Sequence, residues 1–197
     1  MKKKPDAQFN PEPPGRRILL HACCAPCSSA IVEHLVGRGL RPVIFYSNSN
    51  IYPESEYQIR GNECLRYAKE QGLEIVFDDY DHKAWRDVVT GLELEPERGS
   101  RCMMCFRYRL HRAAAYAQKH GFDVLTTTLS SSRWKNLIQI NAAGHYACSL
   151  FPKLKWWDVN WRKGGLQERR NQIIKECGFY NQLYCGCEFS LKNSDKL

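Results

Sequence analysis

The stretch Ile18-Leu-Leu-His-Ala-Cys-Cys-Ala-Pro-Cys27, followed by Ser28-Ser-Ala-Ile-Val-Glu-His-Leu-Val36, decides the fold. Its first five residues form a short apolar run, which is typical of a buried β-strand. The residues after Cys27 have helical apolar spacing, begin with a serine suited to capping a helix, and stop near Gly37. A strand that leads directly into a helix is the first half of a βαβ unit.

The same alternation continues along the chain. Further strands are predicted over residues 42–47, 73–77 and 123–129, and further helices over residues 54–71, 83–92, 102–120, 136–150 and 165–176. The strands are short and continuously apolar, as in parallel sheets that helices cover on both faces. We therefore expect a three-layer, Rossmann-like α/β fold whose ligands bind beyond the carboxyl ends of the strands.

The chain has 197 residues, a length that suits one domain. Residues 1–15 contain four prolines and one glycine and predict a flexible arm. Residues 16–197 are expected to form a single α/β catalytic domain with a C-terminal Cys-x-Cys segment. No apolar run approaches the roughly 20 residues that span a bilayer, and no signal-peptide core follows the first lysines. We expect a cytoplasmic protein that does not associate with membranes.

The net charge is +8, from 29 Lys and Arg against 21 Asp and Glu. Excess positive charge attracts polyanions, and nucleic acid is the commonest of these. A basic, soluble surface without a nucleic-acid partner is the commoner explanation of charge alone. Neither GxxxxGK[ST] nor GxGxxG occurs, so no motif supports a nucleoside triphosphate or dinucleotide site.

Seven of the ten cysteines lie in three tight clusters, which begin at Cys23, Cys102 and Cys185. Cysteine that packs as a small hydrophobe has no reason to recur at such spacings, whereas thiolates that converge on a metal or on each other do. Disulfides are rare in a reducing cytosol, so clustered cysteines there indicate metal binding or redox chemistry.

The first two clusters together predict one metal site. Cys102-x-x-Cys105 has a chelating spacing shared by zinc sites, iron–sulfur sites and redox dithiols. At a helix start, both sulfur atoms lie on nearly one face, and the helix dipole favours thiolates. With Cys23 and Cys24 at a strand end they form a four-thiolate site, which suits zinc or a [4Fe–4S] cluster.

The remaining cysteines are less decisive. Cys185-Gly-Cys187 suits a strained, readily reduced disulfide, two further metal ligands, or two free thiols in a turn. Cys27 lies near a helix start and is either a ligand of a second metal or a small residue at a turn. The three single cysteines are expected to be core or surface residues: Cys64, Cys148 and Cys177.

Other residues near the strand ends are candidates of lower specificity. His21 is either a proton donor to the site or a strand histidine bonded to backbone. The acidic residues after the third strand suit metal or ribose binding, or a solvated loop: Asp78, Asp79 and Asp81. Arginines flank the second cysteine pair and suit phosphate binding or a solvated helix face: Arg98, Arg101, Arg107, Arg109 and Arg112. Trp156, Trp157 and Trp161 suit base stacking or core packing.

Several of these motifs, in this order, resemble the QueH-type epoxyqueuosine reductases. The resemblance covers about residues 16–191 and is carried by His21-Ala-Cys-Cys-Ala-Pro-Cys-Ser28, Tyr52-Pro-x-x-Glu56-Tyr, Arg101-Cys-x-x-Cys-x-x-Tyr108-Arg-Leu110, Thr128-Leu with Lys135-Asn136, and Tyr184-Cys-Gly-Cys-x-Phe-Ser190. Ser130-Ser-Ser-Arg-Trp134 departs from the Ser-Pro-His-like stretch of that family, which affects local substrate contacts but not the metal site.

The resemblance implies a reaction and a set of site residues. The reaction reduces the cyclopentane epoxide of epoxyqueuosine, at the wobble position of tRNA, to the cyclopentene of queuosine. Carried over to this chain, Cys23, Cys24, Cys102 and Cys105 bind a [4Fe–4S] cluster, whereas Cys185 and Cys187 form a redox-active disulfide. The family also implies an additional iron near the cluster, to which no ligands are assigned here, and a nucleotide α-hydrolase-like fold.

The implied partners are the tRNA anticodon loop and an unidentified electron donor. Two other classes of protein fit the same cysteines. A zinc-stabilised RNA-binding module explains four thiolates and the positive charge without any reaction. A metal-independent thiol–disulfide oxidoreductase needs only one cysteine pair.

Overall fold

The parallel strand order of the sheet confirms the predicted three-layer α/β fold. The computed structural model describes residues 9–180 and 182–194. All four strand pairings are parallel, and the order across the sheet is β3-β2-β1-β4-β5. The strands are β1 (Ile18–Ala22), β2 (Val43–Tyr46), β3 (Ile75–Phe77), β4 (Val124–Thr127) and β5 (Lys155–Trp156).

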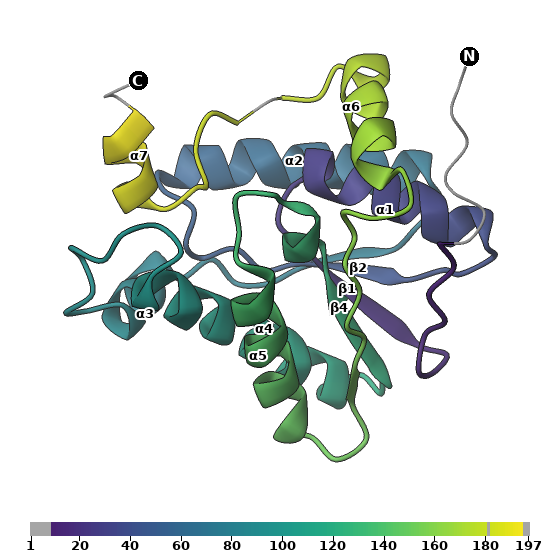
Figure 1. The fold of residues 1–197 in the computed structure, drawn as a ribbon, viewed down its shortest axis with the longest axis horizontal. Helices are drawn as coiled ribbons and strands as arrows, with labels where there is room; N and C mark the ends of the chain where they lie inside the picture. The colour runs from purple at the N-terminus through teal and green to yellow at the C-terminus, as the bar shows by residue number, and fades with distance from the viewer. Residues whose placement is uncertain (1–8, 181, 195–197) are drawn as a thin grey trace.

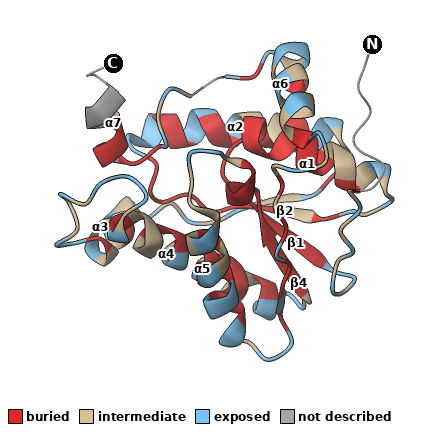
Figure 2. Cartoon of the chain, in the orientation of Figure 1, coloured by how far each residue is buried: buried red, intermediate tan, exposed pale blue. Residues whose placement is uncertain are grey.

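The central strand, β1, shows why this sequence forms a sheet between two helical layers. All five of its residues are buried. Successive side chains of a strand point to opposite faces, so Ile18, Leu20 and Ala22 pack in one core cluster and Leu19 packs in the other. A strand that is buried on both faces has a continuous apolar run, which is the pattern visible in the sequence. Figure 2 shows this buried centre between helices with exposed outer faces.

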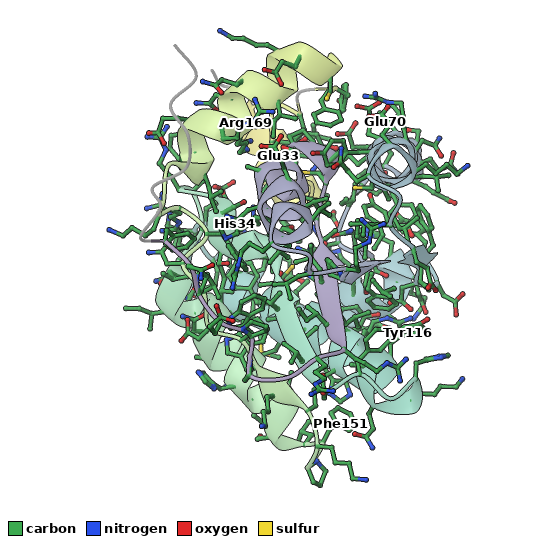
Figure 3. All side chains as sticks on the ribbon, turned by 90° about the vertical axis from the view of Figure 1, so that its right-hand side faces the viewer. Glu33, His34, Glu70, Tyr116, Phe151 and Arg169 are labelled. Atoms are coloured by element: carbon green, nitrogen blue, oxygen red, sulfur yellow. The ribbon has the colours of Figure 1, made fainter. Side chains whose placement is uncertain are left out.

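The helices divide into two layers around the sheet (Figure 1). One layer contains α1 (Ala25–Gly37), α2 (Glu54–Glu70) and α6 (Leu166–Cys177), and the other contains α4 (Ser100–Lys119) and α5 (Leu137–Ser149), with α3 (His82–Val88) beside α4. Within the first layer, the Arg169 guanidinium of α6 pairs with the Glu33 carboxylate of α1 at 2.5 Å, and Figure 3 shows these side chains meeting.

Three short elements differ from the prediction. Strand β5 has two residues and α7 (Glu188–Ser194) has seven. Neither is long enough to show a periodic pattern of apolar residues in the sequence. The fourth predicted strand ends at Thr127 rather than at residue 129, because the Thr127 hydroxyl accepts the Leu129 N–H. The chain turns there into the 3-10 helix η1 (Thr128–Ser131).

The predicted N-terminal arm is only partly described. Residues 1–8 lie outside the described residues. The following residues contact the body of the protein: Phe9 packs edge-on against Trp161, and the Arg38 guanidinium donates to the carbonyl of Pro11 and the carboxylate of Glu12. Among residues 9–180 and 182–194, every helix is too short or too polar to cross a bilayer.

Candidate active site

The first cysteine cluster lies at the turn between β1 and α1, at the carboxyl end of the central strand. Cys24 immediately precedes α1 in an extended conformation, and Pro26 lies in the first turn of the helix, where its missing N–H costs nothing. The sulfur atoms of Cys23, Cys24 and Cys27 all lie within 4.8 Å of one another, and all three residues are buried. This group includes Cys27, whose role the sequence left open.

The second pair begins α4. Cys102 and Cys105 are three residues apart in the first turns of this helix, so their side chains share a face. Cys105 is buried, and Cys102 is partly exposed. Cys102 is also packed against the core cluster that contains Cys23, Cys24 and Cys27.

The third pair, Cys185 and Cys187, lies near the other two cysteine clusters although it comes from the C-terminal part of the chain. In Figure 1 the segment after α6 crosses to α7, which lies near α3. Gly186 has a φ of +127°, and a Cβ there would lie 3.1 Å from both Arg60 and Ile51, so glycine is required between the two cysteines. Cys185 is exposed and Cys187 is buried; both are free thiols.

A buried ion pair holds this third segment. The Arg60 guanidinium donates to the carbonyl oxygens of Tyr184 and Cys185 at 3.3 and 3.2 Å. Arg60 also pairs with the Glu56 carboxylate at 2.7 Å, with side-chain exposures of only 2% and 9%. The backbone N–H of Tyr52 donates to the Gly186 carbonyl at 2.8 Å.

All seven clustered cysteines line one cavity of about 640 Å³. The predicted pairs Cys23–Cys24 and Cys102–Cys105 therefore share a single site, although the three-thiol group with the closest spacing is that of Cys23, Cys24 and Cys27. This volume lies within the range of small-molecule sites, roughly 300–1,000 Å³.

Hydrogen-bond donors point at the sulfur atoms. The Gln182 side-chain amide donates to Cys24 Sγ at 3.0 Å, the backbone N–H of Arg98 donates to Cys102 Sγ at 3.3 Å, and the Thr128 hydroxyl donates to Cys23 Sγ at 3.4 Å. Sulfur accepts such bonds best as a thiolate, and outer hydrogen bonds of this kind are typical around metal-bound thiolates.

Burial opposes ionisation of several of these thiols. It raises the pKa of Cys102 to about 12 and that of Cys187 to about 11. Hydrogen bonds from Cys24 and Cys27 instead lower the pKa of Cys23. A bound cation would favour the thiolate forms that burial penalises, so metal binding at this site would release protons.

The donor set fits a thiophilic metal centre. Seven sulfur atoms line the cavity, and Glu97 is the one carboxylate in its described lining. Thiolates without carboxylates select zinc or iron–sulfur clusters over the harder cations magnesium and calcium. The residues of the cavity therefore fit either a cluster or zinc.

The other predicted candidates mostly have structural partners. His21 Nδ1 lies 2.7 Å from Thr127 Oγ1 and its Nε2 lies 3.1 Å from the Ser47 carbonyl oxygen; burial lowers its pKa to about 3. It is therefore a neutral core histidine. Asp78 pairs with Arg112 at 2.5 Å, and Asp81 caps α3 by accepting the Ala84 N–H.

The arginines divide into two groups. Arg98, Arg101 and Arg109 line the cavity. Arg107, in contrast, lies over the Tyr146 ring, away from the cavity. Arg101 donates to three backbone carbonyls of the loop before α4, and Arg109 donates to the Ser47 carbonyl and to the Asn48 side chain.

For three tryptophans, burial decides between the two alternatives that the sequence left open. Trp156, Trp157 and Trp161 are 9%, 5% and 0% exposed, so these rings pack in the core and are not available to stack on bases. Trp156 fits against Gly144 of α5, where any larger side chain would collide with the indole. The exposed tryptophan is Trp134, which is 76% exposed and lines the cavity. Its neighbours are polar, and no periodicity marked it in the sequence.

Two further cavity residues had no role assigned from sequence. Trp85 is fully buried, and its indole N–H has no hydrogen-bond partner among the described residues. Lys135 also lines the cavity: burial lowers the pKa of its ammonium group, but the nearby cysteines, in their thiolate forms, together raise this pKa by more. The single cysteines lie outside the cavity, with Cys64 and Cys148 buried and Cys177 partly exposed.

Comparison with known proteins identifies the family. The family model described as epoxyqueuosine reductase QueH matches residues 18–193. The chain belongs to the QueH family. The predicted enzyme class, an epoxyqueuosine reductase, is thereby confirmed at the level of the family.

Curated QueH relatives match over most of their length. Epoxyqueuosine reductase QueH of Haemophilus influenzae is 46% identical, over 100% of this chain and 82% of the relative. The Acinetobacter baylyi relative is 45% identical, over 91% and 83% of the two chains, and the Thermotoga maritima relative is 33% identical, over 88% and 90%. A solved NMN synthetase from Francisella tularensis aligns with a TM-score of 0.39 and 13% identity, over 93% of this chain and 84% of that chain.

Proposed function

We propose that this chain reduces epoxyqueuosine to queuosine at the wobble position of tRNA, the last step of queuosine biosynthesis. The observation that carries the proposal is a cavity lined by seven thiols from three distant segments of a QueH-family chain. The reaction removes the epoxide oxygen as water and consumes two electrons and two protons.

The cysteines divide this work between two groups. Cys23, Cys24, Cys102 and Cys105 would hold a [4Fe–4S] cluster, which would supply electrons one at a time, and an additional iron would act as a Lewis acid on the epoxide oxygen. Cys27, the third member of the close thiol group, is the best candidate ligand for that iron.

The Cys185–Cys187 pair completes the electron balance. Oxidation of the two thiols to a disulfide releases two electrons and two protons, which is the requirement of one epoxide reduction. An external redox partner then returns the pair to its dithiol form. The exposure of Cys185 suits this exchange, because an incoming reductant must reach a sulfur atom.

Positive charge in the cavity wall and on the whole chain suits both the thiols and an RNA substrate. The cationic side chain of Lys135 faces the thiols and offsets their negative charge. The tRNA supplies its wobble nucleotide from a single-stranded loop, where a base is free to leave the stack and enter a pocket. The positive net charge of the chain favours association with that polyanion.

The decisive experiment is mass spectrometry of tRNA nucleosides from a strain that lacks this gene. We expect epoxyqueuosine to accumulate and queuosine to disappear, with recovery on return of the wild-type gene and none with Cys24→Ala. Queuosine at its normal level in the deletion strain would refute the proposal.

Anaerobic reconstitution separates the remaining metal chemistries. Iron and sulfide in the purified protein, with visible absorption that bleaches on reduction, support the cluster. A colourless zinc protein that binds RNA without changing it would instead be an RNA-binding module. Full activity in metal-free protein would indicate a thiol–disulfide oxidoreductase.

A further inference from the structure

Trp134 stands apart from the other tryptophans of the chain. Its side chain is 76% exposed, whereas the other four are between 0% and 9% exposed. It lines the opening of the thiol cavity on the loop between η1 and α5. An exposed indole has a large apolar face in water, and such a face at a binding site usually has a partner.

The loop that carries Trp134 is fixed by its backbone. The Trp134 N–H donates to the Ser132 hydroxyl at 3.3 Å, and the Trp134 carbonyl accepts from Arg98 Nε at 2.9 Å. The carbonyl of Arg98 in turn accepts from the Gln139 side chain at 2.9 Å. The backbone of the loop is thus fixed while the ring stays exposed at the opening, so little backbone freedom is lost when the ring binds a partner.

Arg98 itself has an unusual backbone. Its φ of 68° is the one positive φ outside glycine among the described residues. Strained conformations of this kind concentrate at functional sites. Here the conformation lets one residue donate its backbone N–H to Cys102 Sγ and its guanidinium to the Trp134 loop. The metal-site thiols and the exposed indole are therefore held by the same residue.

The cavity wall around Trp134 is strongly cationic. Six basic side chains line it: Arg60, Arg98, Arg101, Arg109, Lys135 and Arg170. Within the described residues only Arg60 of these six pairs with a carboxylate, and the single acidic residue in the lining is Glu97. Lys135 faces the thiols, whereas hydrogen bonds to neutral carbonyls leave the charges of the other four arginines uncompensated: Arg98, Arg101, Arg109 and Arg170. The opening therefore attracts the phosphates of a nucleic acid. A protein surface with few carboxylates would gain nothing from this charge.

We infer that Trp134 stacks on the unpaired base next to the target nucleotide of the RNA. The inference rests on the proposed function, which places the target base in the cavity. A cavity of about 640 Å³ holds one extruded nucleotide, so its neighbours stay at the opening, where Trp134 lies. Aromatic rings beside cationic side chains are the standard platform for single-stranded bases.

The test uses an anticodon stem–loop RNA with unmodified guanine at the wobble position, so that binding occurs without reaction. Its dissociation constant for the reconstituted protein is measured by fluorescence anisotropy, with the label at the end of the stem. We expect Trp134→Ala to weaken binding by about 5- to 150-fold, the range for loss of one base stack. Trp134→Phe keeps an aromatic face and loses less.

Cross-linking locates the contact. With 5-iodouridine at the nucleotide on either side of the wobble position, irradiation should join the RNA to the peptide that contains Trp134. The matched control is Tyr146→Ala, which removes a 48% exposed aromatic ring that does not line the cavity, and it should leave affinity unchanged. Reduction of epoxyqueuosine in tRNA by Trp134→Ala should show a raised KM with kcat within about twofold of the wild-type value.

The possible outcomes separate the stacking role of Trp134 from the proposed function. Unchanged affinity in Trp134→Ala, or cross-links that avoid Trp134, overturns the inference and leaves the proposed function standing. Stem–loop binding that depends on Trp134 in a protein unable to reduce epoxyqueuosine refutes the proposed function and keeps the stacking site. A Trp134→Ala defect confined to electron transfer from a reduced ferredoxin, with RNA affinity intact, would overturn the inference and make the residue part of a protein interface.

Discussion

The turn that carries Cys23, Cys24 and Cys27 and the segment that carries Cys185 and Cys187 reach the same cavity by opposite structural means. The first belongs to the core, where three buried thiols lie between the central strand and its helix. The second crosses the surface between two helices and is held by one buried ion pair and a few backbone hydrogen bonds.

The difference suits the two kinds of sulfur chemistry that we propose for this site. A metal centre needs ligands whose positions do not change, which a strand–helix turn provides. A dithiol that cycles through a disulfide needs access for its reductant and room to change geometry, which a surface segment with glycine provides. The comparison predicts that substitutions in the two regions fail in different ways.

The largest effect is expected in the buried turn. Cys23→Ala or Cys24→Ala should abolish both bound iron and epoxyqueuosine reduction, because a ligand lost from a rigid site is not replaced. Iron and sulfide analysis after anaerobic reconstitution measures the first, and nucleoside mass spectrometry measures the second. Cys148→Ala removes a thiol that is also buried, but outside the cavity, and should keep both properties. Normal iron content in Cys24→Ala would show that Cys24 is not a ligand and would contradict the role proposed for the buried turn.

The surface segment should lose turnover alone. Cys185→Ser or Cys187→Ser keeps the size of the side chain but cannot form a disulfide, so we expect full iron content with no multiple-turnover reduction. The same iron analysis and a steady-state assay with excess tRNA distinguish these results. Iron lost from either variant would show that the pair ligates metal. Both regions would then be metal-binding, and the proposed difference in their chemistry would be wrong.

The sequence predicted the buried turn better than the surface segment. An apolar strand, a cysteine pair and a helix are adjacent in the chain, so local patterns were enough to locate Cys23 and Cys24. The same local reasoning missed α7, which has seven residues, and could not decide between base stacking and core packing for the three tryptophans that lie among basic residues: Trp156, Trp157 and Trp161. Their burial depends on contacts such as that of Trp161 with Phe9, which are distant in sequence.

Long-range contacts also explain the other omissions. Arg60 binds Tyr184 and Cys185, more than a hundred residues later in the chain, and no spacing rule connects these positions. The loop that carries Trp134 is fixed by a hydrogen bond from Arg98, which the sequence placed only among basic residues near the second pair. Conversely, the α/β class was predictable because strands and helices alternate along the chain, and β1-α1-β2 and β2-α2-β3 are local units, although the pairing of β1 with β4 joins residues more than a hundred positions apart.

The ion pair that holds the surface segment gives an intermediate effect. Glu56→Gln leaves the Arg60 charge buried without its carboxylate, which costs about 3–5 kcal/mol of unfolding free energy. Urea denaturation measures this loss, and faster reaction of Cys185 with a thiol reagent should accompany it, because the carbonyls of the segment lose a fixed donor. Glu70→Gln breaks an exposed pair with Arg66, with side-chain exposures of 44% and 40%, and should cost at most about 0.5 kcal/mol. Equal losses in the two variants would show that the buried pair has no special role.

The smallest effect concerns Trp85, which packs in a cluster with Cys105 of the second pair and Cys187 of the surface segment. Its indole N–H is buried without a hydrogen-bond partner among the described residues, and the residue lines the thiol cavity. A donor aimed at cluster sulfur stabilises the reduced, more negative state and so raises the reduction potential. Trp85→Phe removes the N–H and keeps most of the ring, so we expect the potential to fall by an amount on the order of 20–60 mV, the equivalent of one hydrogen bond in a one-electron couple.

An anaerobic redox titration followed by absorption or electron paramagnetic resonance measures this shift. Trp157→Phe provides the control, because that indole is also buried but packs in the other core cluster, away from the thiols. An unchanged potential in Trp85→Phe with an intact cluster would mean that the N–H does not act on the cluster sulfur. Trp85→Phe could instead change the reactivity of the Cys185 and Cys187 thiols and leave the reduction potential of the cluster unchanged. That result would show that Trp85 acts on the surface segment.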